Sequence, residues 1–189
     1  MSSAEAKQML RSLVRAARRQ GPAADPESLA STCLSFVDDL PGPKRVTCYA
    51  SYGTEPGTGP LLDALAASGY EVLLPRVVDD DLEWVPAGGV TVVSGMGIAE
   101  PAGAAVPLLP LRAMLVPALA VGVDGARLGK GGGYYDRVIA GLPAEQRPRV
   151  VALVRDDDVM PAATVPIDAH DQRVDAIITP TRAIACPSP

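Results

Sequence analysis

Short apolar runs alternate with helix-type segments along most of this chain, and this alternation limits its fold more than any other feature. Six apolar stretches are predicted to be strands, namely 46–50, 71–74, 82–85, 113–116, 150–154 and 174–178. Four segments are predicted to be helices, namely 3–20, 26–40, 61–67 and 134–140. Strands that alternate with helices form a mostly parallel sheet covered by helices on both faces. We therefore predict an α/β fold, with residues 1–189 in a single domain.

Glycine and proline mark the predicted boundaries of these elements. Gly21-Pro22 is expected to stop the first helix, and Pro75 is expected to close the second strand. Residues 86–110 contain many glycines and prolines and are predicted to be a loop. The strand at 174–178 is expected to be the last one.

The composition excludes several classes of protein. Hydrophobic residues make up 48% of the chain, which is too many for a disordered protein. No uninterrupted apolar run approaches the roughly 18 residues that a membrane-spanning helix needs, and charges interrupt the N-terminus before a signal peptide could form. Cys33, Cys48 and Cys186 form no close pair, which argues against a zinc site or a disulfide framework. We expect a reduced, cytoplasmic protein.

Charge is distributed unevenly along the chain. The net charge is −5, whereas nucleic-acid-binding proteins are usually basic. Residues 1–19 nevertheless hold five basic residues and one acidic residue, so they carry +4 and the rest of the chain carries −9. The predicted helix at 3–20, capped by Ser2 and Glu5, places Lys7 and Arg11 one turn apart. We expect a local anionic ligand, small-molecule substrates, no nucleic-acid or membrane partner, and a monomer.

A glycine-rich segment at 127–137 is the most informative motif. It follows a predicted strand and precedes a predicted helix, and its glycines would let backbone N–H groups approach an anion closely. It is not a Walker A loop, because Gly131 follows Lys130 where Ser or Thr is needed. It is not a dinucleotide fingerprint either, because Tyr134 stands at the last glycine position. The alternative interpretation is a mobile surface turn.

The run Arg-Leu-Gly-Lys-Gly-Gly-Gly-Tyr-Tyr-Asp at 127–136 resembles the hallmark of the 5-formyltetrahydrofolate cyclo-ligase family. Weaker family motifs occur in the right order elsewhere, namely Lys7-x-x-Leu10-Arg11, Ser51 with Glu55 and Thr58, Pro75-Arg76, Gly97 to Pro101, Val116-Pro117, and Pro166 to Asp175 with Thr179. The chain departs from the family at Val121-Gly122, where Phe-Asp is usual, and within Asp156–Asp158, where a Gln is common.

The resemblance implies conversion of 5-formyltetrahydrofolate to 5,10-methenyltetrahydrofolate with ATP and Mg²⁺, and it implies particular site residues. Those for ATP are Lys7, Arg11, Arg127, Leu128, Gly129, Lys130, Gly131, Gly132, Gly133, Tyr134 and Tyr135. Those for the folate are Ala50, Glu55, Lys130, Gly131, Gly132, Gly133 and Tyr134. Lys130 is the expected catalytic residue, and the expected metal ligands are Asp136 and Asp171.

Several expectations complete this interpretation. Lys7 and Arg11 are expected to be exposed, and His170 is expected to hold the turn that carries Asp171. The acidic run 156–158 is expected to be a solvated turn. Two other functions are weighed against the cyclo-ligase: a nucleotide-binding module without ligase activity, and a sugar-phosphate isomerase. Neither explains so many motif matches in order.

Overall fold

The computed structural model describes residues 2–89, 91–93 and 99–187 and contains a seven-stranded sheet in the order β12-β11-β9-β6-β1-β2-β3. Its five central strands run parallel, namely β1 (Arg45–Thr47), β2 (Glu71–Val78), β6 (Ala113–Pro117), β9 (Arg149–Leu153) and β11 (Ala176–Ile178). The two edge strands are antiparallel to their neighbours, namely β3 (Asp81–Pro86) and β12 (Ala183–Ala185).

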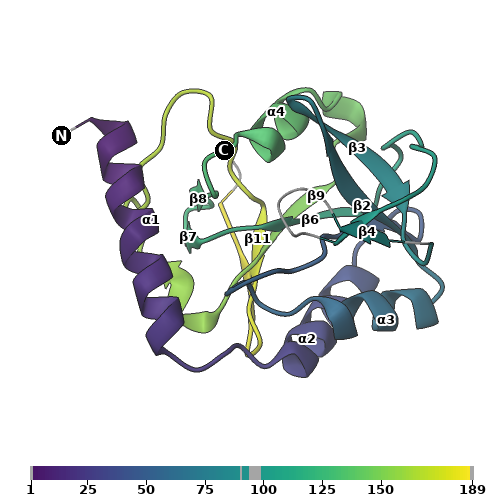
Figure 1. Cartoon of the computed structure of the whole chain (residues 1–189), viewed down its shortest axis with the longest axis horizontal. Coiled ribbons are helices and arrows are strands. Elements are labelled where there is room, and N and C mark those ends of the chain that lie inside the picture. Colours follow the sequence, from purple (N-terminus) through teal and green to yellow (C-terminus); the bar gives the residue numbers. More distant parts are fainter. Residues whose placement is uncertain (1, 90, 94–98, 188–189) are drawn as a thin grey trace.

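Helices cover both faces of this sheet. Helices α2 (Pro26–Asp38) and α3 (Gly59–Ala67) lie against one face, and α4 (Tyr134–Ala140) lies against the other (Figure 1). Buried side chains of α2 and α3 form one apolar core with alternate residues of β1, β6, β9 and β11. Residues from the opposite face of the strands, including Met114, Val150 and Ile177, pack with Ile139 of α4 in a second core. The predicted α/β architecture is confirmed.

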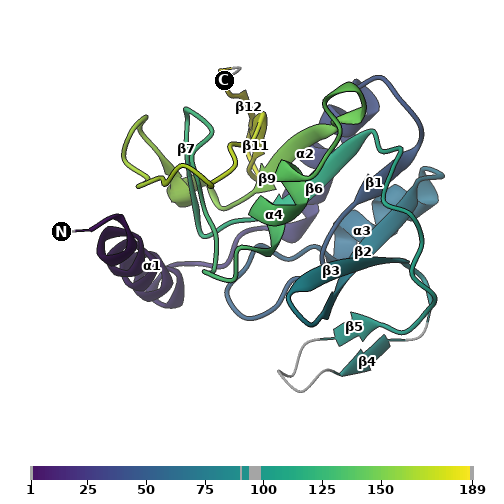
Figure 2. The ribbon, with the colours of Figure 1, turned by 90° about the horizontal axis from the view of Figure 1, so that it is seen from above.

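Helix α1 (Ser3–Gln20) stands at one side of the molecule, away from the large sheet (Figure 2). Ser2 and Glu5 form the predicted capping box at its start. Its buried Val14 packs against a three-stranded sheet of β10 (Val159–Met160), β7 (Ala120–Gly122) and β8 (Arg127–Leu128). This small sheet was not predicted, because strands of two or three residues are too short for a hydrophobic period to be recognised.

Strand β2 corrects the prediction that Pro75 closes it, since the strand continues to Val78. The carbonyl of Leu73 faces β1 and accepts from Cys48 N at 2.9 Å. Pro75 stands two residues later, so the backbone nitrogen of Pro75, which carries no hydrogen, faces the same side of the strand. β1 pairs with β2 only as far as Leu73, so no ladder hydrogen bond is lost there.

Three further boundaries differ from the predictions. β1 covers three residues instead of the predicted 46–50. β12 follows β11, so the strand near 174–178 is not the last. The predicted loop at 86–110 contains β4 (Thr91–Val93) and β5 (Ala99–Pro101), which pair antiparallel. The remaining short elements are the 3-10 helices η1 (Ala144–Gln146) and η2 (Asp156–Asp158). Among the described residues, no helix is both long and apolar enough to span a membrane.

Candidate active site

A cavity of about 580 Å³ opens beside the carboxyl ends of β1, β2 and β6, the usual ligand position in open α/β sheets. It also lies against α1, the connection between β8 and α4, and the segment at 168–171. The structure brings together here every residue that the sequence singled out for ATP, folate or metal, namely Lys7, Arg11, Ala50, Glu55, Arg127, Leu128, Gly129, Lys130, Gly131, Gly132, Gly133, Tyr134, Tyr135, Asp136 and Asp171. Glu100 and Pro101 of the central motif also line it, whereas Gly97 and Ile98 lie outside the described residues.

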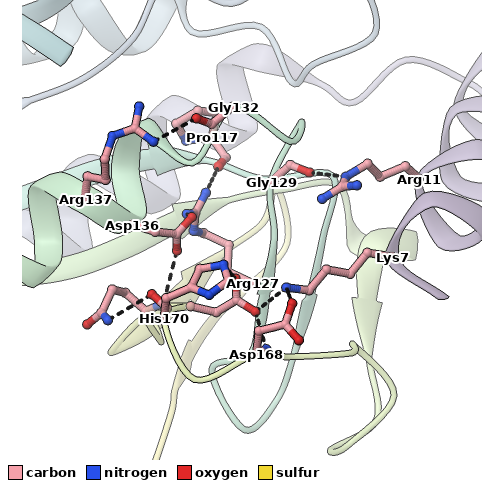
Figure 3. Close-up of polar contacts among 12 residues, drawn as sticks. Lys7, Arg11, Pro117, Arg127, Gly129, Gly132, Asp136, Arg137, Asp168 and His170 are labelled. Atoms are coloured by element: carbon pink, nitrogen blue, oxygen red, sulfur yellow. Dashed lines mark hydrogen bonds and ion pairs between the residues drawn. The ribbon is translucent and has the colours of Figure 1, made fainter. Parts of the chain in front are cut away.

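The glycine loop forms the connection between β8 and α4. Gly131 and Gly133 have φ of +114° and +69°, in the left-handed region that favours glycine. A Cβ at Gly132 would lie 2.6 Å from the ring of Tyr134, so a larger residue would displace that ring. Arg11 donates from Nε to the carbonyl of Gly129 at 2.9 Å, which fixes the loop to α1 (Figure 3). The loop is therefore tied to α1 and lines the cavity, which favours a binding loop over the alternative of a mobile surface turn.

Lys7 projects from α1 into the segment at 168–171 (Figure 3). Its Nζ lies 2.7 Å from Asp168 Oδ2 and also pairs with Asp171, and the residue is 8% exposed. The expectation of an exposed Lys7 is therefore wrong. Burial works to lower the pKa of Lys7, but the hydrogen bonds to the two carboxylates outweigh it and raise that pKa.

Arg127 and Asp136 form a second ion pair in the cavity wall, with 2.9 Å between Arg127 Nη2 and Asp136 Oδ2. Arg127 is 7% exposed, and its guanidinium lies 5.8 Å from the ring centre of Tyr135. Asp136 Oδ1 accepts from Gln172 N at 3.0 Å. Asp136 is thereby bonded to the residue that follows Asp171, so the two predicted metal ligands stand on segments that contact each other.

Lys130 crosses the mouth of the cavity. Its Nζ lies 2.7 Å from Glu55 Oε1 and 3.3 Å from the ring centre of Tyr52. The side chain of Glu55 is only 5% exposed, and its other oxygen accepts from Tyr52 N at 2.9 Å. The expected catalytic residue and one of the residues expected to bind the folate are therefore in direct contact.

The turn that carries Asp171 is not held by the side chain of His170. That side chain is 79% exposed, and its Nε2 lies 3.8 Å from Asp171 Oδ1. Asp171 itself closes the turn, because its Oδ2 accepts from Asp168 N at 2.6 Å. The expected role of His170 is therefore corrected.

The acidic run at 156–158 is not a solvated turn throughout. Asp158 is 5% exposed and pairs with Arg18 of α1 at 2.8 Å. Arg18 also donates to the carbonyls of Ala118 and Leu119, each at 2.9 Å. Burial raises the pKa of Asp158, although Arg18 acts in the opposite direction. These contacts anchor the C-terminal end of α1, while Lys7 anchors its N-terminal half.

The residues of the cavity wall that the sequence did not assign to the site include the apolar Ala4, Leu74, Val77 and Leu82 and the polar Asp168, Tyr49 and Tyr52. Asp168 stood inside the C-terminal motif, three residues before the chosen Asp171, which is a spacing that suits a shared cation. Tyr49 precedes Ala50, and Tyr52 lies between Ala50 and Glu55. Nothing in the sequence showed which side chains of this segment face the cavity.

Together, the fold and the cavity define an α/β protein with a glycine loop and cationic side chains arranged around one cavity. The chain belongs to the 5-formyltetrahydrofolate cyclo-ligase family, whose model matches residues 3–180. It is therefore an enzyme of the ligase class in folate metabolism, and the predicted resemblance is confirmed.

Similar proteins agree with this assignment. The 5-formyltetrahydrofolate cyclo-ligase of Mycolicibacterium smegmatis is 35% identical, over 96% of this chain and 97% of its own length. The probable 5-formyltetrahydrofolate cyclo-ligase of Schizosaccharomyces pombe is 28% identical, over 82% and 84%. The structure of 5,10-methenyltetrahydrofolate synthetase from Aquifex aeolicus matches with a TM-score of 0.76 and 26% identity, covering 97% of this chain and 94% of that one.

Proposed function

We propose that this protein converts 5-formyltetrahydrofolate to 5,10-methenyltetrahydrofolate, using ATP and Mg²⁺ and releasing ADP and phosphate. One observation carries the proposal: a single cavity has both a basic, glycine-rich wall and a buried carboxylate. Backbone N–H groups and cations suit the triphosphate. Glu55 is an acceptor suited to the N–H edge of a pterin.

The chemical obstacle is that a formamide oxygen leaves poorly. Transfer of the γ-phosphoryl group of ATP to the formyl oxygen would make that oxygen part of a phosphate leaving group. N10 of the folate then attacks the formyl carbon and gives up its proton, the bond between that carbon and the phosphorylated oxygen breaks, and the phosphate departs carrying that proton. Positioning and charge stabilisation supply most of the catalysis in such transfers.

Lys130 is the residue that we assign to the transfer step. Its ammonium lies between the glycine loop and Glu55, where the triphosphate and the pterin would meet. A cation at this point would stabilise the negative charge of the phosphoryl group in transfer. Lys7, Arg11 and Arg127 would hold the remaining phosphate charge.

The carboxylates around Lys7 fit a magnesium ion. Asp168, His170 and Asp171 each offer a ligand atom, and these atoms lie within 4.8 Å of one another. Carboxylate oxygens are the ligands that Mg²⁺ prefers, and the ion commonly keeps several waters. We propose that Asp136 and Asp171 hold it, with Asp168 as a further carboxylate; Asp136 is not one of the group just described and pairs with Arg127. The bound ion would supply positive charge to the phosphates of ATP.

An absorbance assay tests this function. Purified protein is mixed with 5-formyltetrahydrofolate and Mg²⁺, and formation of the methenyl chromophore is followed with and without ATP. We expect the chromophore only with ATP. The alternative, a nucleotide-binding module without ligase activity, would bind ATP in a calorimetric titration and form no chromophore. We further propose that the enzyme works as a cytoplasmic monomer, which sedimentation and cell fractionation would test.

A further inference from the structure

Tyr49 contributes to the cavity a polar group that neither the sequence motifs nor the proposed reaction uses. The residue leaves β1 two positions after its last residue, Thr47, and lines the cavity beside Ala50. It is 4% exposed, and its hydroxyl is buried. Within residues 2–89, 91–93 and 99–187, that hydroxyl has no hydrogen-bond partner. Buried polar groups are nearly always paired, so this exception in a ligand cavity requires an explanation.

The backbone that carries Tyr49 is held firmly. Its carbonyl accepts from Thr58 Oγ1 at 2.6 Å, and Thr58 is fully buried. Ser51 and Thr58 also bond each other reciprocally, since each backbone N–H donates to the other's hydroxyl at 3.0 Å. These three bonds close the loop at 51–58 onto the end of β1. The unpaired hydroxyl therefore sits on a rigid support, as a group that recognises a ligand should.

The neighbourhood fixes the chemical character of this hydroxyl. Burial raises the pKa of Tyr49 well above its ordinary value, and the charge of Glu55 raises it further. The phenol is therefore protonated at neutral pH and offers an O–H donor. Glu55 is an acceptor-only carboxylate whose charge acts on this hydroxyl, and both residues line the cavity, so a donor and an acceptor lie close together at this wall.

We infer that the Tyr49 hydroxyl is a substrate-binding group that donates to the pterin ring of the folate beside the N–H groups taken by Glu55. A pterin presents ring and exocyclic N–H donors next to a ring carbonyl. An acceptor paired with a neutral donor matches that edge, which the carboxylate alone would match only in part. This inference rests on the proposed function, because it takes the ligand of this wall to be the folate.

The experiment compares Tyr49→Phe with Tyr70→Phe. Tyr70 is also buried, but it lies outside the cavity, and its hydroxyl donates to Asp38 at 2.6 Å and accepts from Arg112 at 2.8 Å. For Tyr49→Phe we expect the Kd of 5-formyltetrahydrofolate, measured by titration, to rise about 3- to 10-fold, as loss of one neutral hydrogen bond implies. The KM for ATP should stay within about two-fold, and the melting temperature should not fall, because no protein partner is lost. Tyr70→Phe should show the reverse: a lower melting temperature with unchanged folate binding.

The outcomes separate this inference from the proposed function. Two results would overturn the role of Tyr49. One is an unchanged folate affinity in Tyr49→Phe, and the other is an equal loss of folate and ATP affinity together with a lower melting temperature. In both cases, turnover by the wild-type protein would still support the proposed function. If the wild-type protein binds folate but forms no methenyl product, the function fails, and the Kd ratio still decides the role of Tyr49. A wild-type protein that does not bind folate overturns both.

Discussion

Lys130 Nζ and Glu55 Oε1 lie 2.7 Å apart, which joins the two walls of the cavity through one ion pair. Glu55 is nearly buried, whereas a third of the Lys130 side chain is exposed, so the lysine covers the carboxylate from the solvent side. A folate entering this site would meet both groups at once. Changes at either residue should therefore affect more than one property of the enzyme.

Lys130→Ala should lower turnover strongly. One cation that stabilises a transferring phosphoryl group is worth about 2–4 kcal/mol, or on the order of 10²–10³ in rate. The change also leaves the buried Glu55 without its cation, so folate affinity should move as well. Steady-state kinetics and a melting curve measure these effects. Lys44→Ala is the matched control, because Lys44 is exposed and also lies over a tyrosine, 5.4 Å from the ring centre of Tyr70. Similar activity in both variants would contradict the role of Lys130.

Glu55→Gln should raise the KM for the folate by about 10- to 100-fold, because a hydrogen bond to a charged group is worth about 1.5–3 kcal/mol. The KM for ATP should change much less. When Glu55→Gln is combined with Lys130→Ala, the two effects should be less than additive, since the residues share one contact. Glu83→Gln supplies the control, because Glu83 pairs with Arg76 at 2.6 Å without lining the cavity. If the effects of the two substitutions on the KM for the folate were fully additive, the ion pair would make no contribution to folate binding.

Local sequence features predicted the elements that are bounded by local signals. The capped helix at 3–20 and the glycine loop before α4 follow from residues a few positions apart. The partners of the basic helix could not be predicted this way. Lys7 and its partner Asp168 are 161 positions apart in the sequence, and Arg18 and Asp158 are 140 positions apart. The charge of a residue does not show which distant acidic residue the fold brings close to it. Their burial was missed for the same reason.

Lys7→Ala and Arg11→Ala should separate stability from ligand binding. Both should weaken ATP binding by roughly ten-fold if each cation makes one charge-assisted contact. Only Lys7→Ala should lower the melting temperature clearly, because it leaves Asp168 and Asp171 facing each other without a cation. Arg11 donates a hydrogen bond to the Gly129 carbonyl, and the loss of this bond in Arg11→Ala should lower the melting temperature only slightly. Calorimetric titration of ATP and melting curves measure both. Unchanged ATP affinity in the two variants would show that these cations only attach α1 to the body.

The ion pair between Lys7 and Asp168 should stabilise the protein within a defined pH window. The hydrogen bond from Lys7 lowers the pKa of Asp168 below its ordinary value of 3.8, so its contribution is present above that pH and is lost as pH falls through the lowered pKa. The pKa of Lys7 is raised above 10.5 by its two carboxylates against the effect of burial, so its contribution is present below that pH and is lost as pH rises through the raised pKa.

Melting temperatures of the wild-type protein and Lys7→Ala, measured across pH, test this window. The difference between them should be largest near neutral pH and should shrink at both extremes, in acid as Asp168 is protonated and in alkali as Lys7 loses its proton. Arg11→Ala, which removes a cation from the same helix without touching these carboxylates, should show no such dependence. A difference between wild type and Lys7→Ala that stays constant with pH would mean that Lys7 stabilises α1 by packing of its alkyl chain instead of by charge.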